Sequence, residues 1–345
     1  MSIPFRSRYT FVSFVLFSFA FFLATLGFSQ QSLILVAAGS GLPEGLYQNL
    51  NGEFGRENSR VAVRYLPMGT EEGTRQMQKG EADLGGGDYP LGASEMDANR
   101  GKVLQIPVAT AGLAIVCNVP GVNQELNLTG PVIADIYLSK ITKWDNPEIA
   151  RLNPGVALPN VGILVLHRSE GKGANYIITD FLSKASPEFK AKVGRSLAPK
   201  WVTGTTLARA EDILFQVKDT DGAIGYVELD LALKANVPMA HIKNADGAFV
   251  KPSPASLAAA AANANLGEDL HGSLMNASGK DSYPISSFTW IYVPEASKSP
   301  DRRLAVKNYI NWLLSNGQAL TSKYGYGPLP PAVATKAKAR LAGLK

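Results

Sequence analysis

The sequence feature that most constrains the fold is a unit that occurs three times along the chain. Each unit consists of a short apolar run, a glycine-rich loop and a helical pattern, and the three loops cover residues 39–43, 68–73 and 168–174. Alternating apolar runs and helical patterns are typical of α/β architecture, in which the loops at the carboxyl ends of parallel strands meet at one edge of a sheet. We therefore expect an α/β fold whose three loops converge on one small ligand.

The three loops carry the groups that bind an anion. Free backbone N–H groups and the positive end of the dipole attract negative charge to a helix N-terminus. Ser40 and Thr70 add hydroxyl donors. Leu42 and Gly173 add backbone N–H groups, and Arg168 adds a guanidinium that can hold two oxygens at once. This donor set predicts a site for a tetrahedral oxyanion.

Asp88 follows three glycines, at 85–87, and lies at the expected carboxyl end of another strand. A carboxylate beside a bound anion costs free energy unless the ligand donates a hydrogen bond to it. Hydrogen phosphate has a proton to donate and sulfate has none. A carboxylate at this point is therefore expected to favour phosphate over sulfate.

Residues 1–29 have the three-part layout of a secretory signal peptide. Arg6 and Arg8 precede an apolar run over residues 11–27, and small and polar residues follow. The run is a little short for a membrane-spanning helix of about 20 residues. We expect cleavage near Ser29 and export to the periplasm, with an uncleaved membrane anchor as the alternative.

The length and formal charge of the chain limit the number of its domains and the classes of ligand that it can bind. The 316 residues after the signal are enough for two domains. Removing the signal takes away two arginines and no acidic residue, so the formal charge falls from +5 to +3. A nucleic-acid-binding protein would show a denser basic stripe, so we expect no nucleic-acid partner, whereas mild positive charge suits small anions.

The reactive side chains are too few and too scattered for catalysis. Cys117, the only cysteine, lies in an apolar run and is expected to be a buried, inert thiol. His167 is expected to pack within a strand, and neither it nor His241 or His271 has metal-ligand spacing. The glycine loops do not complete the phosphate loop of a nucleotide-binding enzyme, and a hydrolase would lack a base or metal pair. We expect a binding protein without a metal or cofactor, not an enzyme.

Other segments complete the α/β pattern. An almost pure alanine stretch at 258–264 is expected to form a surface helix that carries no site. No repeat of fixed period and no long linker is present, so two lobes joined by crossing strands fit better than two separate domains. Strands are also expected at 114–119 and 288–293, and helices at 131–138, 304–314 and 332–344.

Several motifs resemble the family of periplasmic phosphate-binding proteins that serve phosphate ABC importers, and the resemblance extends from about residue 37 to residue 329. The motifs are Asp-Ile-Tyr-Leu at 135–138 with Lys-Trp-Asp at 143–145, Leu-Asn-Pro-Gly at 152–155, Gly-Ala-Ile-Gly-Tyr-Val-Glu at 222–228, Tyr-Pro-Ile at 283–285 and Tyr-Gly-Tyr at 324–326.

This resemblance implies a two-lobed fold of the type II periplasmic binding proteins, in which each lobe is a mixed sheet flanked by helices and two hinge strands cross between the lobes. The first lobe would comprise residues 30–109 and 283–345, and the second residues 110–282. The implied function is capture of inorganic phosphate between the lobes by a monomer, and delivery to the membrane permease subunits of an ABC importer. A phosphate sensor or scavenger is the alternative that involves no transport.

The resemblance also assigns site residues. Asp88, Arg168 and Gly173 match the family's phosphate contacts, and Thr70 stands where the family has serine. Glu170 stands where the family has an aspartate that braces the arginine. These five residues are expected to keep the inherited roles.

Four positions depart from the family pattern. Gly41, Lys172 and Ala174 replace contacting hydroxyl residues, and Glu71 replaces a serine. Ser40 and Lys172 are expected to replace the lost donors, and Glu71 either faces the ligand or pairs with Lys172 or Arg168. Phosphate is the first choice of ligand. Another oxyanion, or a phosphate ester or phosphonate that uses the room at Gly41 and Ala174, is the alternative.

Overall fold

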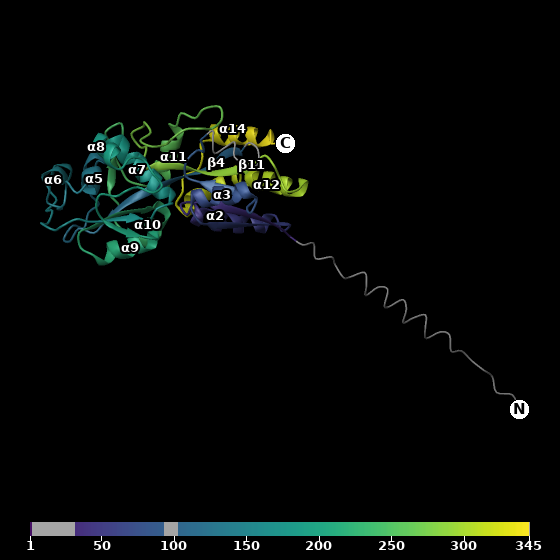
Figure 1. Cartoon of the computed structure of the whole chain (residues 1–345), viewed down its shortest axis with the longest axis horizontal. Helices are drawn as coiled ribbons and strands as arrows, with labels where there is room; N and C mark the ends of the chain where they lie inside the picture. Colours follow the sequence, from purple (N-terminus) through teal and green to yellow (C-terminus); the bar gives the residue numbers. More distant parts are fainter. Residues whose placement is uncertain (2–31, 93–102, 345) are drawn as a thin grey trace.

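The computed structural model describes residues 32–92 and 103–344, together with Met1 (Figure 1). The expected signal peptide lies outside the described residues. The elements of the first half are β1 (Leu33–Gly39), α2 (Glu44–Glu57), β2 (Val61–Pro67), α3 (Thr70–Lys79), β3 (Leu84–Gly87), β4 (Val103–Cys117), β5 (Asn127–Leu128), α5 (Gly130–Tyr137), α6 (Pro147–Leu152) and β6 (Leu164–Arg168).

The second half continues the alternation of helices and strands. Its elements are α7 (Gly173–Ala185), α8 (Pro187–Lys192), β7 (Thr205–Leu207), α9 (Ala210–Asp219), β8 (Ala223–Glu228), α10 (Leu229–Ala235), β9 (His241–Lys243), β10 (Phe249–Val250), α11 (Pro254–Ala262), β11 (Ser286–Pro294), α12 (Pro300–Leu313), α13 (Gln318–Thr321), the 3-10 helix η1 (Ser322–Tyr324) and α14 (Pro331–Ala342).

One mixed sheet of eight strands runs through the molecule in the order β2-β1-β3-β11-β4-β8-β6-β7. The strands at its two ends are parallel, because β1 pairs with β2 and β3 while β6 pairs with β7 and β8. The middle of the sheet is antiparallel, through β11 and β4. The predicted parallel units therefore form the two ends, and a smaller sheet of β10, β9 and β5 accompanies them.

Strand β4 joins the two ends of the sheet. Its ladder with β11 extends to Gly112, and its ladder with β8 begins at Leu113. Helices α2, α3, α12 and α14 surround one end, and α5 to α10 surround the other (Figure 1). The expected two lobes are thus two ends of one continuous sheet. The lobe boundary expected at residue 110 stays a prediction and lies near the point where β4 changes partner.

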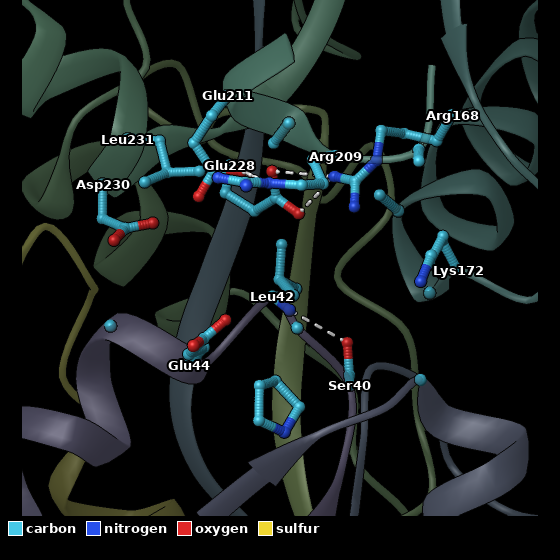
Figure 2. Close-up of a pocket in the computed structure, with 18 of the residues that line it drawn as sticks. Ser40, Leu42, Glu44, Arg168, Lys172, Arg209, Glu211, Glu228, Asp230 and Leu231 are labelled. Carbon is cyan, nitrogen blue, oxygen red and sulfur yellow. Dashed lines mark hydrogen bonds and ion pairs between the residues drawn. The ribbon is translucent and has the colours of Figure 1, made fainter. Parts of the chain in front are cut away.

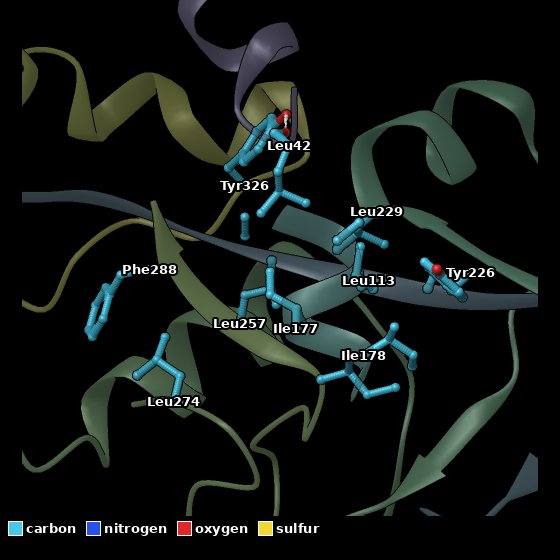
Figure 3. Close-up of a cluster of buried hydrophobic side chains, with 14 of the residues drawn as sticks. Leu42, Leu113, Ile177, Ile178, Tyr226, Leu229, Leu257, Leu274, Phe288 and Tyr326 are labelled. Atoms are coloured by element: carbon cyan, nitrogen blue, oxygen red, sulfur yellow. Dashed lines mark hydrogen bonds between the residues drawn. The ribbon is translucent and has the colours of Figure 1, made fainter. Parts of the chain in front are cut away.

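Buried side chains from both ends of the sheet gather around β4 (Figure 3). Leu113 of β4, Ile177 of α7 and Leu257 of α11 are each at most 1% exposed. At the top of Figure 3, the hydroxyl of the buried Tyr326 donates to the Leu42 carbonyl oxygen at 2.7 Å. The C-terminal segment is therefore fixed to the loop that precedes α2.

The alanine-rich helix α11 is more buried than the sequence predicted. Its N-terminus has a capping box, in which the Ser253 side chain accepts a hydrogen bond from the Ser256 N–H. Leu257, Ala260 and Ala261 are buried, and the helix packs on β4 and β11. A Cβ at Gly112 would lie 2.6 Å from Leu257 Cδ2, so the absence of a side chain there permits this packing. Small residues let α11 approach the sheet closely.

A pair of glycine variants tests the register of the sheet. Gly39 pairs with Gly86, and a Cβ at Gly39 would lie 2.1 Å from the Gly86 carbonyl oxygen. Gly39→Ala should lower the free energy of unfolding by about 3 kcal/mol or more, because the backbone of β3 must move. The exposed Gly52 of α2 has open space around it, so Gly52→Ala should raise the free energy by about 0.5–1 kcal/mol. Urea unfolding of residues 30–345 measures both, and a stable Gly39→Ala variant would contradict the register.

Candidate functional site

A cavity of about 360 Å³ lies at the carboxyl ends of β1 and β6, between the two ends of the sheet (Figure 2). Most of the predicted binding residues line it. They are Ser40, Gly41, Leu42, Arg168, Lys172, Gly173 and Ala174. The two predicted binding residues that do not line the cavity are Thr70 and Asp88. Asp88 lies directly behind Gly173, because a Cβ at Gly173 would lie only 1.6 Å from Asp88 Oδ2.

The predicted convergence of the loops is present in the structure. The Ser40 hydroxyl donates a short hydrogen bond to the Asp88 carboxylate, which connects the first loop to the end of β3. A Cβ at Gly69 would lie 2.9 Å from the carbonyl oxygen of Gly171, so the second and third loops are in close contact. All three loops and Asp88 therefore meet at one place.

The helices that begin at this place have no side-chain caps. Pro43, Gly69 and Lys172 precede α2, α3 and α7, and none of them caps its helix with a side chain. In contrast, Thr129 caps α5 and Ser186 caps α8. The first N–H groups of a helix have no partner within it. The three helix starts at the site therefore present donors to a ligand.

Arg168 is held in place by residues of β8 and α7. Its Nη1 donates to Glu228 Oε1 at 3.0 Å, and both side chains are more than nine-tenths buried. Its backbone N–H donates to the Tyr226 hydroxyl at 3.0 Å, and this hydroxyl donates to Asn175 Oδ1. Arg168 Nε is buried without a hydrogen-bond partner in the part of the chain that the structure describes. The guanidinium is thus fixed by one ion pair while one donor stays available.

The structure changes the expected role of two acidic residues. Glu170 was expected to brace Arg168, but Glu170 is exposed and Glu228 forms the ion pair. Glu71 is exposed on the first turn of α3 and does not line the cavity, and the described residues form no ion pair with it. Glu228 takes the bracing role because β8 is the neighbour of β6, and both residues end their strands.

Asp88 is a buried acid with an open acceptor. Its side chain is 0% exposed, and burial raises its pKa to about 7, against the lowering effect of the Ser40 hydrogen bond. The negative charge of Glu228 raises the pKa further. Within the described ranges, Asp88 Oδ1 and the hydroxyl of the equally buried Thr70 have no hydrogen-bond partner. Buried polar atoms without partners are rare in native proteins, and both of these atoms are available to bind a ligand.

Two of the expected donors already have partners. The Leu42 N–H donates to Ser40 Oγ at 3.0 Å, and the Ser40 hydroxyl itself donates to Asp88. Both groups face the cavity, but each would have to exchange its partner to reach a ligand. The assignment of Ser40 and Leu42 as ligand contacts stays a prediction.

The cavity is also lined by six charged side chains that were not expected from the sequence to belong to the site. The signal that could have located them is their position, since most follow the carboxyl ends of β1, β7 and β8. They are Glu44, Arg209, Glu211, Glu228, Asp230 and Lys234.

The other singled-out residues have structural surroundings. His167 is buried, and its ring stacks on Trp201 at a centroid distance of 4.9 Å, as expected for a packed strand residue. Burial raises the pKa of the Cys117 thiol to about 12, so the thiol is protonated at neutral pH. Across residues 32–92 and 103–344, no three His, Cys, Asp or Glu side chains are placed to hold a metal ion. No helix in the described ranges combines the length and apolar composition needed to cross a bilayer.

The sequence is similar to that of known binding proteins. A family model described as a PBP superfamily domain matches residues 27–317. The phosphate-binding protein PstS of Xylella fastidiosa is 36% identical over 272 residues, which cover 78% of this chain and 74% of that protein. The phosphate-binding protein PstS of Pasteurella multocida is 33% identical over 325 residues, which cover 93% of each chain.

Solved structures share the fold. A periplasmic phosphate-binding protein named PfluDING, solved with bound phosphate, has a TM-score of 0.71 at 19% identity and covers 89% of this chain and 93% of its own. An ABC-type phosphate transport receptor from Vibrio cholerae has a TM-score of 0.59 at 18% identity and covers 86% of this chain and 100% of its own. Together with the family match, this likeness confirms the expected two-lobed α/β fold class.

The raised pKa of Asp88 predicts how stability depends on pH. Between pH 4 and 7 the folded chain keeps a proton that the unfolded chain has lost, so the free energy of unfolding falls as pH rises. Asp88→Asn cannot ionise and should remove this fall. The variant should nearly match the wild type at pH 4 and exceed it by about 4 kcal/mol at pH 8. Urea unfolding without phosphate or sulfate measures this, and parallel pH profiles would show that Asp88 is not the buried acid responsible.

Proposed function

Because the chain belongs to the PBP superfamily, and within it to the family of PstS phosphate-binding proteins, we propose that it captures inorganic phosphate in the cavity between the two ends of its sheet. The phosphate is then passed to the membrane permease subunits of an ABC importer. The chain acts as an exported, periplasmic monomer and catalyses no reaction. Its lobes comprise residues 30–109 with 283–345, and residues 110–282.

The observation that carries this proposal is the set of buried polar atoms without partners. Arg168 Nε and the Thr70 hydroxyl can donate hydrogen bonds, and Asp88 Oδ1 can accept one. The uncapped N-termini of α2, α3 and α7 add backbone donors around them. Many donors with one buried acceptor match hydrogen phosphate, which has several acceptor oxygens and one proton to donate.

The departures from the family pattern are compatible with an anion site. Gly41 and Ala174 offer no hydroxyl, but Lys172 lines the same cavity and can supply a positive charge instead. Arg168 stays oriented by Glu228, so its fork geometry is preserved. We assign the ligand contacts to Thr70, Asp88, Arg168, Lys172 and Gly173.

Titration calorimetry of residues 30–345 with phosphate tests the proposal. Saturable binding of one phosphate is expected, and a hundredfold excess over the dissociation constant should raise the free energy of unfolding by about 2.7 kcal/mol. Gly173→Ala should abolish binding, because the added Cβ would clash with the Asp88 carboxylate. Gly52→Ala, at a position that does not line the cavity, is the matched control and should bind normally. Absence of heat with the wild-type chain would refute the proposal.

Competition between phosphate and sulfate tests the role of Asp88. At pH 8 the carboxylate is ionised and accepts the phosphate proton, so sulfate should bind at least tenfold more weakly. The preference should shrink at pH 5.5, where a protonated Asp88 can donate to sulfate. Asp88→Asn should show little preference at either pH. An unchanged ratio of the two dissociation constants in this variant would exclude Asp88 as the discriminating acceptor.

A further inference from the structure

The cavity is larger than a phosphate ion requires. Its volume of about 360 Å³ falls within the range of roughly 300–1,000 Å³ that is usual for pockets holding organic ligands. Arg168, Lys172 and Ser40 lie at one side of the cavity, and Glu44, Glu211 and Asp230 lie at the other (Figure 2). The cavity thus has a basic side at the oxyanion cradle and an acidic side beyond it.

Most charges that line the cavity neutralise one another. Three ion pairs account for six of them: Arg168 with Glu228 at 3.0 Å, Lys234 with Asp230 at 2.9 Å, and Arg209 with Glu211 at 3.4 Å. Among the described residues, the two cavity-lining charges without an ion pair are Lys172 and Glu44. The unpaired cation is on the basic side and the unpaired anion on the acidic side (Figure 2).

The surroundings of Glu44 favour a positive charge. Its hydrogen bond from the Gln48 amide, at 2.8 Å, leaves it without a cationic partner in the described chain. Burial raises its pKa most, and the negative charges of Glu211, Asp230 and Glu228 raise it further. The charge of Arg209 lowers the pKa to a smaller extent, and the nearby Lys234 is paired with Asp230. A ligand cation would relieve this repulsion.

The space between the two sides is open. A Cβ built at Gly41 meets no atom within 4 Å, and Gly41 stands between Ser40 of the cradle and the start of α2 at Glu44. Ala174, on the other wall, also carries a minimal side chain. A short substituent on a phosphoryl group can therefore extend from the cradle toward Glu44.

We propose that this cavity binds a phosphate monoester or phosphonate whose short substituent carries an ammonium group. The phosphoryl group occupies the cradle beside Arg168 and Lys172, and the ammonium group pairs with Glu44 and the neighbouring Glu211. A neutral substituent would leave Glu44 unpaired, and a carboxylate there would be repelled. This inference rests on the proposed function, since it assumes that the cradle holds the phosphoryl group.

Calorimetric titration of residues 30–345 at pH 7.5 tests the inference with matched pairs of ligands. The pairs are 2-aminoethylphosphonate with ethylphosphonate, and phosphoethanolamine with ethyl phosphate. In each pair the ammonium compound should bind at least about fivefold more tightly, as expected of one partly buried ion pair. Glu44→Gln should bring the ratio of the two dissociation constants close to one. Glu81→Gln, an exposed acid outside the cavity lining, is the control and should keep the wild-type ratio.

The possible outcomes separate the two proposals. Phosphate binding with a wild-type ratio near one overturns the ammonium site and leaves the proposed function intact. Failure of phosphate to bind overturns the proposed function itself, whichever of the four organic ligands bind. A wild-type ratio that survives in Glu44→Gln overturns the role of Glu44. Should that variant fail to fold, Glu211→Gln, which changes a half-exposed side chain of the same acidic side, should also lower the ratio.

Discussion

The close contact between the Asp88 carboxylate and the backbone of Gly173 is the constraint on which the site depends. Asp88 ends β3 at one end of the sheet, and Gly173 begins α7 at the other. A buried acid is costly in free energy, and this one lies beside the positive end of a helix and accepts a hydrogen bond from Ser40. The contact leaves no room for a side chain at position 173. The two halves of the site can meet only because the residue of α7 at this contact is a glycine, which has no side chain.

Groups in the site that could bind a ligand lower the free energy of unfolding of the protein without a ligand. Helices α2, α3 and α7 begin at the site without side-chain caps, whereas Ser253 and Ser299 cap helices elsewhere in the chain. Buried atoms of Thr70, Asp88 and Arg168 stay without partners in the described structure. Each such group costs about 1–3 kcal/mol when it is left unsatisfied. A ligand that satisfies several of them at once recovers this free energy as binding.

The sequence predicted the local parts of the site well and its long-range parts poorly. Strand, loop and helix are consecutive in the chain, so apolar runs and glycines were enough to locate the three loops, Asp88 and Arg168. The partner of Arg168 depends on β6 lying beside β8, 60 residues away, and no local pattern indicates this pairing. The run of alanines at 258–262 in α11 likewise does not indicate which of its members are buried, because they all have the same side chain. The continuity of the sheet depends on β4, whose length exceeds that of the apolar run expected at 114–119.

The exchange of partners along β4 has a consequence for how the molecule loses its structure. The strand completes the ladder of β11 with one segment and that of β8 with the next, with no interruption between Gly112 and Leu113. If either end of the sheet unfolds, β4 loses the hydrogen-bond partner on that side and its edge becomes exposed. The other end of the sheet depends on the same strand. The two lobes are therefore coupled through shared backbone hydrogen bonds, and denaturation is expected to be one cooperative transition across the whole chain rather than two independent ones.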